Sequence, residues 1–91
     1  MIKLTGRLVC TNSDETARIR RYLPAHTRLT KQEAGCLLFE VKETDDPLVW
    51  TVEELFESQE SFDAHQARTK ASVWGQETRT IAREYVITEV V

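Results

Sequence analysis

Residues 33–41, EAGCLLFEV, carry the signals that decide the fold of this 91-residue chain. Gly35 fits the left-handed backbone position that ends a helix or turns a chain. From Cys36 onward the apolar and polar residues alternate, which is typical of a strand. The alternation predicts one face made of Leu37, Phe39 and Val41. The segment therefore predicts a helix that ends in a glycine turn and leads into a strand.

The same reading extended outward predicts four strands, at residues 2–10, 36–44, 48–57 and 81–91. A helix is expected from the capping residue Asn12 toward Leu29, broken into two pieces by Pro24. Ser58 can cap a second helix, and a short helix is expected around Trp74, interrupted at Gly75. Gly6, inside the first strand, indicates a bulge or a close approach to the backbone.

The order strand, helix, strand, strand, helix, strand predicts an α+β fold of one domain covering residues 1–91. Right-handed crossovers turn this order into a ferredoxin-like, four-stranded antiparallel sheet with both helices on one face. The other face would lack a helix, so we expect a homodimer that packs two such faces together. Cys10 and Cys36 would fall at opposite ends of parallel strands, and no disulfide is expected.

Charge and hydropathy exclude several classes of partner. The net charge of −3, from 12 basic and 15 acidic residues, argues against nucleic acid as a partner. No window approaches the roughly 20 apolar residues of a membrane span, and the first residues do not resemble a secretory leader. With only two cysteines, we expect reduced thiols and a cytoplasmic protein.

His65 is the first candidate for catalysis. It shares a helical stripe with Phe62 and Thr69, so its side chain is expected to point toward the sheet. A neutral imidazole there could take the proton of a phenol or quinol near neutral pH. The alternative is a buried histidine that only hydrogen-bonds a backbone carbonyl or a nearby acid.

Glu54 is the acid most easily paired with it. It lies on the more apolar face of the third predicted strand, where a carboxylate needs a partner. A pair with His65 would fix the imidazole tautomer and raise its basicity. Alternatively, the pair would only tie the second helix to the sheet.

Four further residues are candidates for binding a flat, apolar substrate. They are the aromatic residues Trp50, Trp74 and Tyr85, together with His26. Each aromatic residue would also fit an ordinary core, and His26 would also fit an exposed helix face.

Patterns for cofactors and metals are missing. The chain has neither a phosphate-binding glycine loop nor a dinucleotide fingerprint, so no cofactor is expected. Its two histidines are not four residues apart on one helix, so no metal centre is expected.

Three motifs resemble the antibiotic biosynthesis monooxygenase (ABM) domain family. They are EAGCLLFEV at 33–41, Glu54 and Phe56 as an acid-x-aromatic pair, and the segment FDAH that ends at His65. The resemblance spans nearly the whole chain and implies the dimeric α/β barrel superfamily. It also implies a quinol monooxygenase-like activity.

The chain departs from the family pattern at three places. Ala34 stands where a proline is frequent, and residues 66–70 lack a second histidine. The first strand has no asparagine of the kind that haem-degrading members use.

We therefore expect a small cofactor-independent enzyme that oxidises a quinol or polyphenol-type aromatic substrate with O2, with His65 as base. A non-catalytic, dimeric module that binds a small ligand is the alternative. A haem-binding or haem-degrading member of the same fold is the third possibility.

Overall fold

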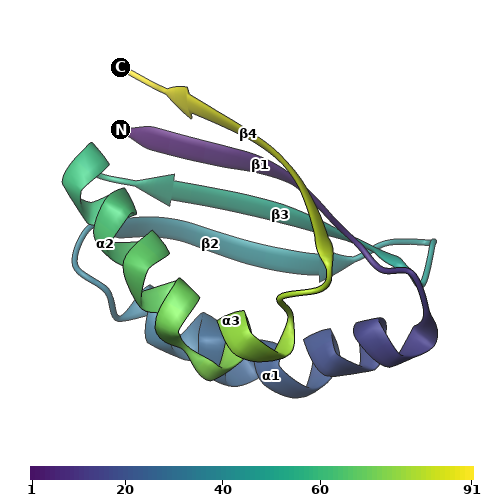
Figure 1. Ribbon diagram of the computed structural model, residues 1–91. Helices are drawn as coiled ribbons and strands as arrows, with labels where there is room; N and C mark the ends of the chain where they lie inside the picture. The colour runs from purple at the N-terminus through teal and green to yellow at the C-terminus, as the bar shows by residue number, and fades with distance from the viewer.

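A computed structural model describes all 91 residues. Figure 1 shows a sheet covered by helices, and the elements follow the predicted order, including the short helix expected around Trp74. They are β1 (Ile2–Val9), α1 (Ser13–Lys31), β2 (Cys36–Glu43), β3 (Val49–Phe56), α2 (Gln59–Ala71), α3 (Val73–Glu77) and β4 (Ala82–Glu89).

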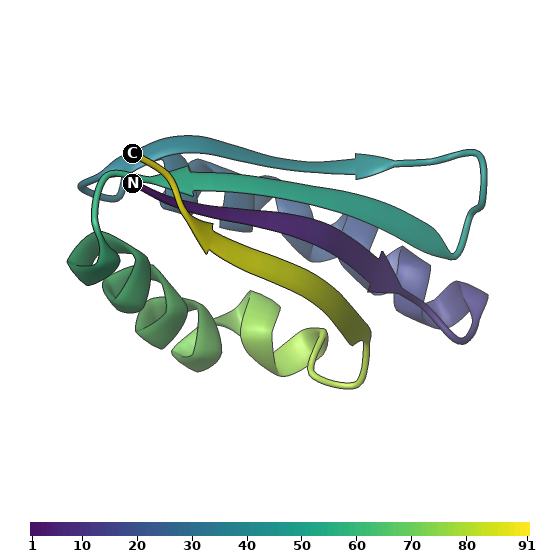
Figure 2. The same cartoon turned by 90° about the horizontal axis from the view of Figure 1, so that it is seen from above.

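The four strands form one antiparallel sheet in the order β2-β3-β1-β4. All three helices lie against the same face of this sheet (Figures 1 and 2). This arrangement confirms the predicted α+β, ferredoxin-like fold. The opposite face carries no helix, and the homodimer through that face stays a prediction. None of the helices combines the length and apolar character needed to cross a membrane.

The core fills the space between the helices and the sheet. Its eleven buried residues are Ile2, Leu4, Leu8, Cys10, Ile19, Trp50, Val52, Phe56, Phe62, Trp74 and Ile81. The members from β1 and β3 alternate along their strands, as the period of two predicts. Cys10 and Cys36 are free thiols, in agreement with the prediction of no disulfide.

The glycine turn before β2 has the predicted conformation. Gly35 has a φ of 85° and is the only residue with a positive φ. Its carbonyl accepts a hydrogen bond from the amide of Glu57 at 2.8 Å, which joins the start of β2 to the end of β3. A Cβ at Gly35 would lie 2.5 Å from the Cβ of Ser61.

The expected break at Pro24 is wrong, because α1 runs unbroken from Ser13 to Lys31. Proline removes one hydrogen bond, to the carbonyl of Arg20 four residues earlier. Both residues are exposed, so water can hydrate that carbonyl. Ile19 and His26, seven residues apart on one helix face, are both buried and keep the two halves of α1 packed.

The predicted face of β2 is also partly wrong. The register shifts between Cys36 and Leu38, so the strand contains a bulge at Leu37. Leu37 is 54 % exposed, whereas Cys36 packs against the core. Phe39 and Val41, beyond the bulge, share one face as predicted, and this face lines the space between the sheet and the helices. The expected interruption of the short helix at Gly75 is also wrong, because α3 continues through Gly75.

We predict that Gly35→Ala lowers the free energy of unfolding. Placing a side chain in the left-handed region costs about 1–3 kcal/mol, and the contact with Ser61 adds to that cost. Urea unfolding should show a lower midpoint than for the control Ala34→Gly, which changes an exposed neighbour. An unchanged midpoint for Gly35→Ala would contradict this account of the turn.

Candidate functional site

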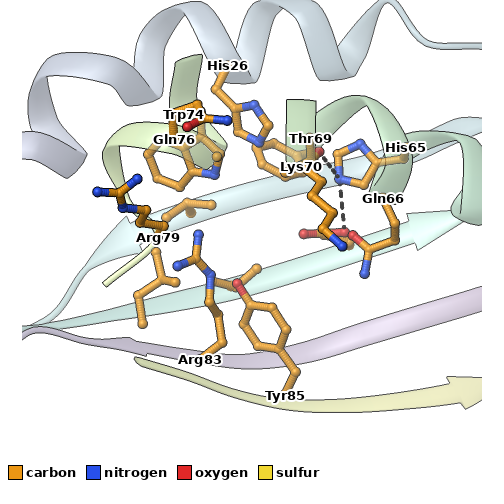
Figure 3. Close-up of a pocket in the computed structure, with 16 residues that line it drawn as sticks. His26, His65, Gln66, Thr69, Lys70, Trp74, Gln76, Arg79, Arg83 and Tyr85 are labelled. Carbon is orange, nitrogen blue, oxygen red and sulfur yellow. Dashed lines mark hydrogen bonds and ion pairs between the residues drawn. The ribbon is translucent and has the colours of Figure 1, made fainter. Parts of the chain in front are cut away.

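A cavity of about 530 Å³ opens between the helices and the sheet (Figure 3). Strand residues form its floor, helix residues its wall, and polar side chains its rim. The floor includes Leu8, Phe39, Val41, Val52 and Glu54; the wall includes His26, His65, Thr69 and Trp74; the rim includes Gln66, Lys70, Gln76, Arg79, Arg83 and Tyr85. The cavity thus has an apolar floor with one carboxylate and two imidazoles.

His65 projects from α2 toward the sheet, as its position in the helical stripe predicts, and is 2 % exposed. Its Nδ1 lies 2.6 Å from Oε1 of Glu33. Its Nε2 lies 3.6 Å from Oε1 of Glu54 and 3.4 Å from the hydroxyl of Thr69. The ring of Phe56 lies 4.8 Å away, centroid to centroid. One imidazole nitrogen is therefore held, and the other is directed at the cavity side.

Glu33 holds His65, a role that the sequence analysis did not predict. Its other oxygen, Oε2, accepts a hydrogen bond from Nε of Arg68 at 2.9 Å. Arg68 also donates from Nη2 to the hydroxyl of Thr30 at 2.9 Å. Burial works to raise the pKa of Glu33, but the hydrogen bonds and charges of Arg68 and His65 outweigh burial and lower it. Glu33 is thus an ionised acceptor for the imidazole.

The protonation state of His65 follows from these contacts. Burial lowers its pKa and opposes the raising effect of Glu33, and the charge of Arg68 lowers it further. The net shift is downward, so the ring is neutral at neutral pH. Because Glu33 accepts at Nδ1, the single ring proton belongs on Nδ1. Nε2 then carries the lone pair, which meets the Thr69 hydroxyl at 3.4 Å, and it can act as a base once a substrate hydroxyl replaces that long contact.

Glu54 faces the helices as predicted, but it does not hold the imidazole. Its Oε1 is buried and has no hydrogen-bond partner. Burial, together with the charge of Glu33, raises the pKa of Glu54 to about 7. Near neutral pH this carboxyl group is therefore partly protonated. It can give or take a proton close to Nε2 of His65.

His26 and Trp74 form an aromatic wall of the cavity. Their rings are stacked at 4.8 Å with an interplanar angle of 5°, and the edge-on ring of Phe39 lies 5.4 Å from His26. His26 is 4 % exposed, so the expectation of an exposed helix face is wrong. Burial, followed by the charges of Arg68 and His65, lowers its pKa to about 3. His26 is therefore neutral and presents a flat surface.

Trp50 and Tyr85 have different positions. Trp50 lies in the core away from the cavity lining, and its indole N–H donates to the hydroxyl of Thr16 at 2.7 Å. Trp50 faces the helices, as predicted. However, it lies four residues before Glu54, which is about 13 Å along the strand, so it packs beneath the first half of α1 and does not reach the cavity. Tyr85 lines the cavity, and burial raises the pKa of its phenol to about 12.

Metal ligands are not gathered in this cavity or elsewhere. No group of three or more His, Cys, Asp and Glu side chains is arranged to hold a metal ion.

Comparisons with known proteins agree with this architecture. A family model for the antibiotic biosynthesis monooxygenases matches residues 1–77. No curated protein sequence gives a significant match.

Three similar solved structures illustrate the likeness. A provisionally assigned antibiotic biosynthesis monooxygenase from Nitrosomonas europaea is 18% identical, with a TM-score of 0.77 over 100% of this chain and 99% of that one. A provisionally assigned one from Deinococcus radiodurans is 19% identical, with a TM-score of 0.76 over 100% and 93%. SnoaB, a cofactor-independent oxygenase from Streptomyces nogalater, is 10% identical, with a TM-score of 0.79 over 99% and 92%. At these identities the structures establish a shared fold.

We predict that Glu33→Ala lowers the pKa of His65 further. The substitution removes the hydrogen bond and the negative charge that raise that pKa. It also removes the acceptor at Nδ1, so the Nδ1–H tautomer should lose its dominance. Nitrogen-15 NMR of the imidazole measures both effects. The control is Glu60→Ala, which changes an exposed residue on α2, the helix that carries His65. An unchanged tautomer in Glu33→Ala would contradict the assignment of the ring proton to Nδ1.

We also predict that Glu54 makes the fold less stable as pH rises. Its folded-state pKa of about 7 exceeds the ordinary value of 4.5 for a glutamate, so the folded chain retains a proton that the unfolded chain has released. Stability from this group is complete below about pH 4.5 and declines up to about pH 7, by about 3 kcal/mol. His65 and His26 act in the opposite direction, because their folded-state pKa values are lowered.

The contribution of Glu54 is isolated by comparing variants. Between pH 5 and pH 8, Glu54→Gln should gain stability relative to the native chain in urea unfolding. Glu53→Gln, on the exposed opposite face of β3, should follow the native chain. Parallel pH profiles for the native chain and Glu54→Gln would show that Glu54 titrates normally.

Proposed function

The chain belongs to the antibiotic biosynthesis monooxygenase family, and we propose that it is a cofactor-independent oxygenase for an electron-rich aromatic substrate such as a quinol. The observation that carries the proposal is the orientation of His65, which lines the cavity and meets only the long contact of the Thr69 hydroxyl at Nε2 while Glu33 holds Nδ1. SnoaB, which shares the fold, bears the name of a cofactor-independent oxygenase.

In this proposal His65 removes a phenolic proton from the bound substrate. Nε2 accepts the proton, and the imidazolium that forms is stabilised by the ionised Glu33 across the ring. Arg68 holds Glu33 in place through Oε2, so the ring is oriented before the substrate arrives. Orientation by a fixed carboxylate is the general arrangement of a histidine base.

The substrate anion then reacts with O2, which is the only oxidant required. A ring carbon that carries hydrogen forms a bond to oxygen, and proton return gives a hydroperoxide. The O–O bond breaks as that carbon loses its hydrogen; one oxygen atom stays on the ring as a carbonyl group and the other leaves as water. A quinol plus O2 thus gives a hydroxyquinone plus water, and the substrate supplies all four electrons.

The protonated His65 returns its proton to the peroxide, and Glu54 suits the next step, in which the departing oxygen takes a proton and leaves as water. Its carboxyl group is partly protonated near neutral pH, and its buried Oε1 has no other partner. It lies 3.6 Å from Nε2 of His65, so both groups border the same part of the cavity. We assign His65 as the base and Glu54 as the acid that protonates the departing oxygen.

The shape of the cavity favours a flat substrate. Its volume of about 530 Å³ is within the ordinary range of small-molecule sites, roughly 300–1,000 Å³. The stacked rings of His26 and Trp74 provide a planar wall above the apolar strand residues. A cavity of this volume and shape suits a bicyclic or tricyclic quinol.

We predict that His65→Ala slows oxygen uptake with a responsive quinol by about 10²–10⁴-fold, the usual contribution of a general base. An oxygen electrode and a panel of quinols measure the rates. The control is Asp63→Ala, an exposed residue on the same helix.

Equal rates for the native chain and His65→Ala would refute His65 as the base. Binding of a quinol without any enzymatic oxygen uptake would instead favour a non-catalytic binding module built on the same cavity.

A further inference from the structure

The rim of the cavity carries three cations without partners. Lys70, Arg79 and Arg83 all line it, and none of them forms an ion pair. The only acidic lining residue is Glu54, which is buried in the floor. The whole chain has a net charge of −3, so this positive rim contrasts with the rest of the molecule. A local excess of one sign at a cavity attracts ligands of the other sign.

Arg83 is held in a fixed position within this rim. Its Nη1 donates to the carbonyl oxygens of Thr78 at 2.5 Å and Ile81 at 2.9 Å. Its Nη2 donates to the hydroxyl of Thr78 at 2.8 Å, and Thr78 is fully buried. Three neutral acceptors therefore orient the guanidinium without neutralising its charge.

Two of the five donors of Arg83 are not used by Thr78 or Ile81, and the only protein group beside them is the phenol of Tyr85. They are Nε–H and the second N–H of Nη2, which together form one edge of the planar guanidinium. That edge matches the two oxygens of a carboxylate. The phenol of Tyr85 lies beside Arg83 and can donate a further hydrogen bond (Figure 3).

Figure 3 shows where these groups lie relative to the proposed base. Arg79 and Arg83 are on one side of the cavity and His65 is on the other, with Lys70 between them in this view. A ligand that spans the cavity would place one end at the cations and the other at Nε2 of His65.

We propose that the substrate is an aromatic carboxylate, whose acid group binds the free edge of Arg83 with Arg79 and Lys70 adding charge at the rim. The inference rests on the proposed function for the phenolic end of the substrate. Recognition of the acid group is a separate property, because it needs neither proton transfer nor O2. The substrate class is thereby narrowed from quinols in general to hydroxylated aromatic acids.

The test compares 6-hydroxy-2-naphthoic acid, whose phenol and acid groups lie at opposite ends of the ring system, with 2-naphthol by calorimetry under argon at pH 7.5. The native chain should bind the acid about 10- to 100-fold more tightly, the range expected for hydrogen bonds to a charged group. Arg83→Gln should reduce this preference to about threefold or less. Arg28→Gln, an exposed arginine on α1, should leave it unchanged.

Arg83 also donates hydrogen bonds to Thr78 and Ile81, so Arg83→Gln could unfold the chain, and a second variant is needed. Lys70→Gln combined with Arg79→Gln alters only exposed side chains and should weaken the preference and its dependence on salt. Equal binding of acid and naphthol by the native chain would overturn the proposal. So would binding of neither compound, or a preference that survives in every folded rim variant. An acid preference without oxygen uptake would leave this inference standing and refute the proposed reaction.

Discussion

The buried contact between Glu33 and His65 is the interaction on which the site depends. Glu33 follows α1, His65 and Arg68 belong to α2, and Thr30 closes the group from α1. A carboxylate withdrawn from water is stable only when it is paired and hydrogen-bonded, and both oxygens of the partly buried Glu33 are satisfied. The same contacts join two helices, fix the imidazole tautomer and keep one carboxylate ionised. Glu54, on the other side of the ring, lacks such partners, and its raised pKa leaves it partly protonated near neutral pH.

Most of the fold could be predicted from sequence because it depends on periodicity, which is a local property. Alternation along β3 placed Glu54 on the helix-facing side, and the helical stripe placed His65 toward the sheet. The errors come from backbone events that alternation does not record. Pro24 is tolerated within α1 because the carbonyl it leaves unbonded lies on the solvent side of the helix. At Leu37 a one-residue bulge changes the face of the strand, and no turn residue signals it.

The site was less predictable, because it depends on contacts between distant segments. Glu33 is in a turn, where no period indicates its direction, and it lies 32 residues before His65. A usable signal was present in α2, since His65 and Arg68 are three residues apart and can share one acceptor. His26, a candidate for substrate binding, lines the cavity, whereas the alternative of an exposed helix face fails because α1 is unbroken and buries this residue. Trp50 is the opposite case. Alternation correctly placed its side chain on the helix-facing side of β3, but it lies too far along the strand from Glu54 to line the cavity.

The cavity itself depends on a gap in an otherwise filled row of side chains. On the helix-facing side of β1, Leu4 and Leu8 are buried core residues, and Gly6 lies between them without a side chain. A Cβ there would lie 2.8 Å from the ring of Tyr85, its partner across the strands. The register shows no bulge in β1, so Gly6 provides a close approach, one of the two alternatives its position suggested. The missing side chain lets an aromatic ring from the edge strand β4 reach over the sheet. Thus β1, which contributes no candidate acid or base, determines how Tyr85 lines the cavity beside Arg83.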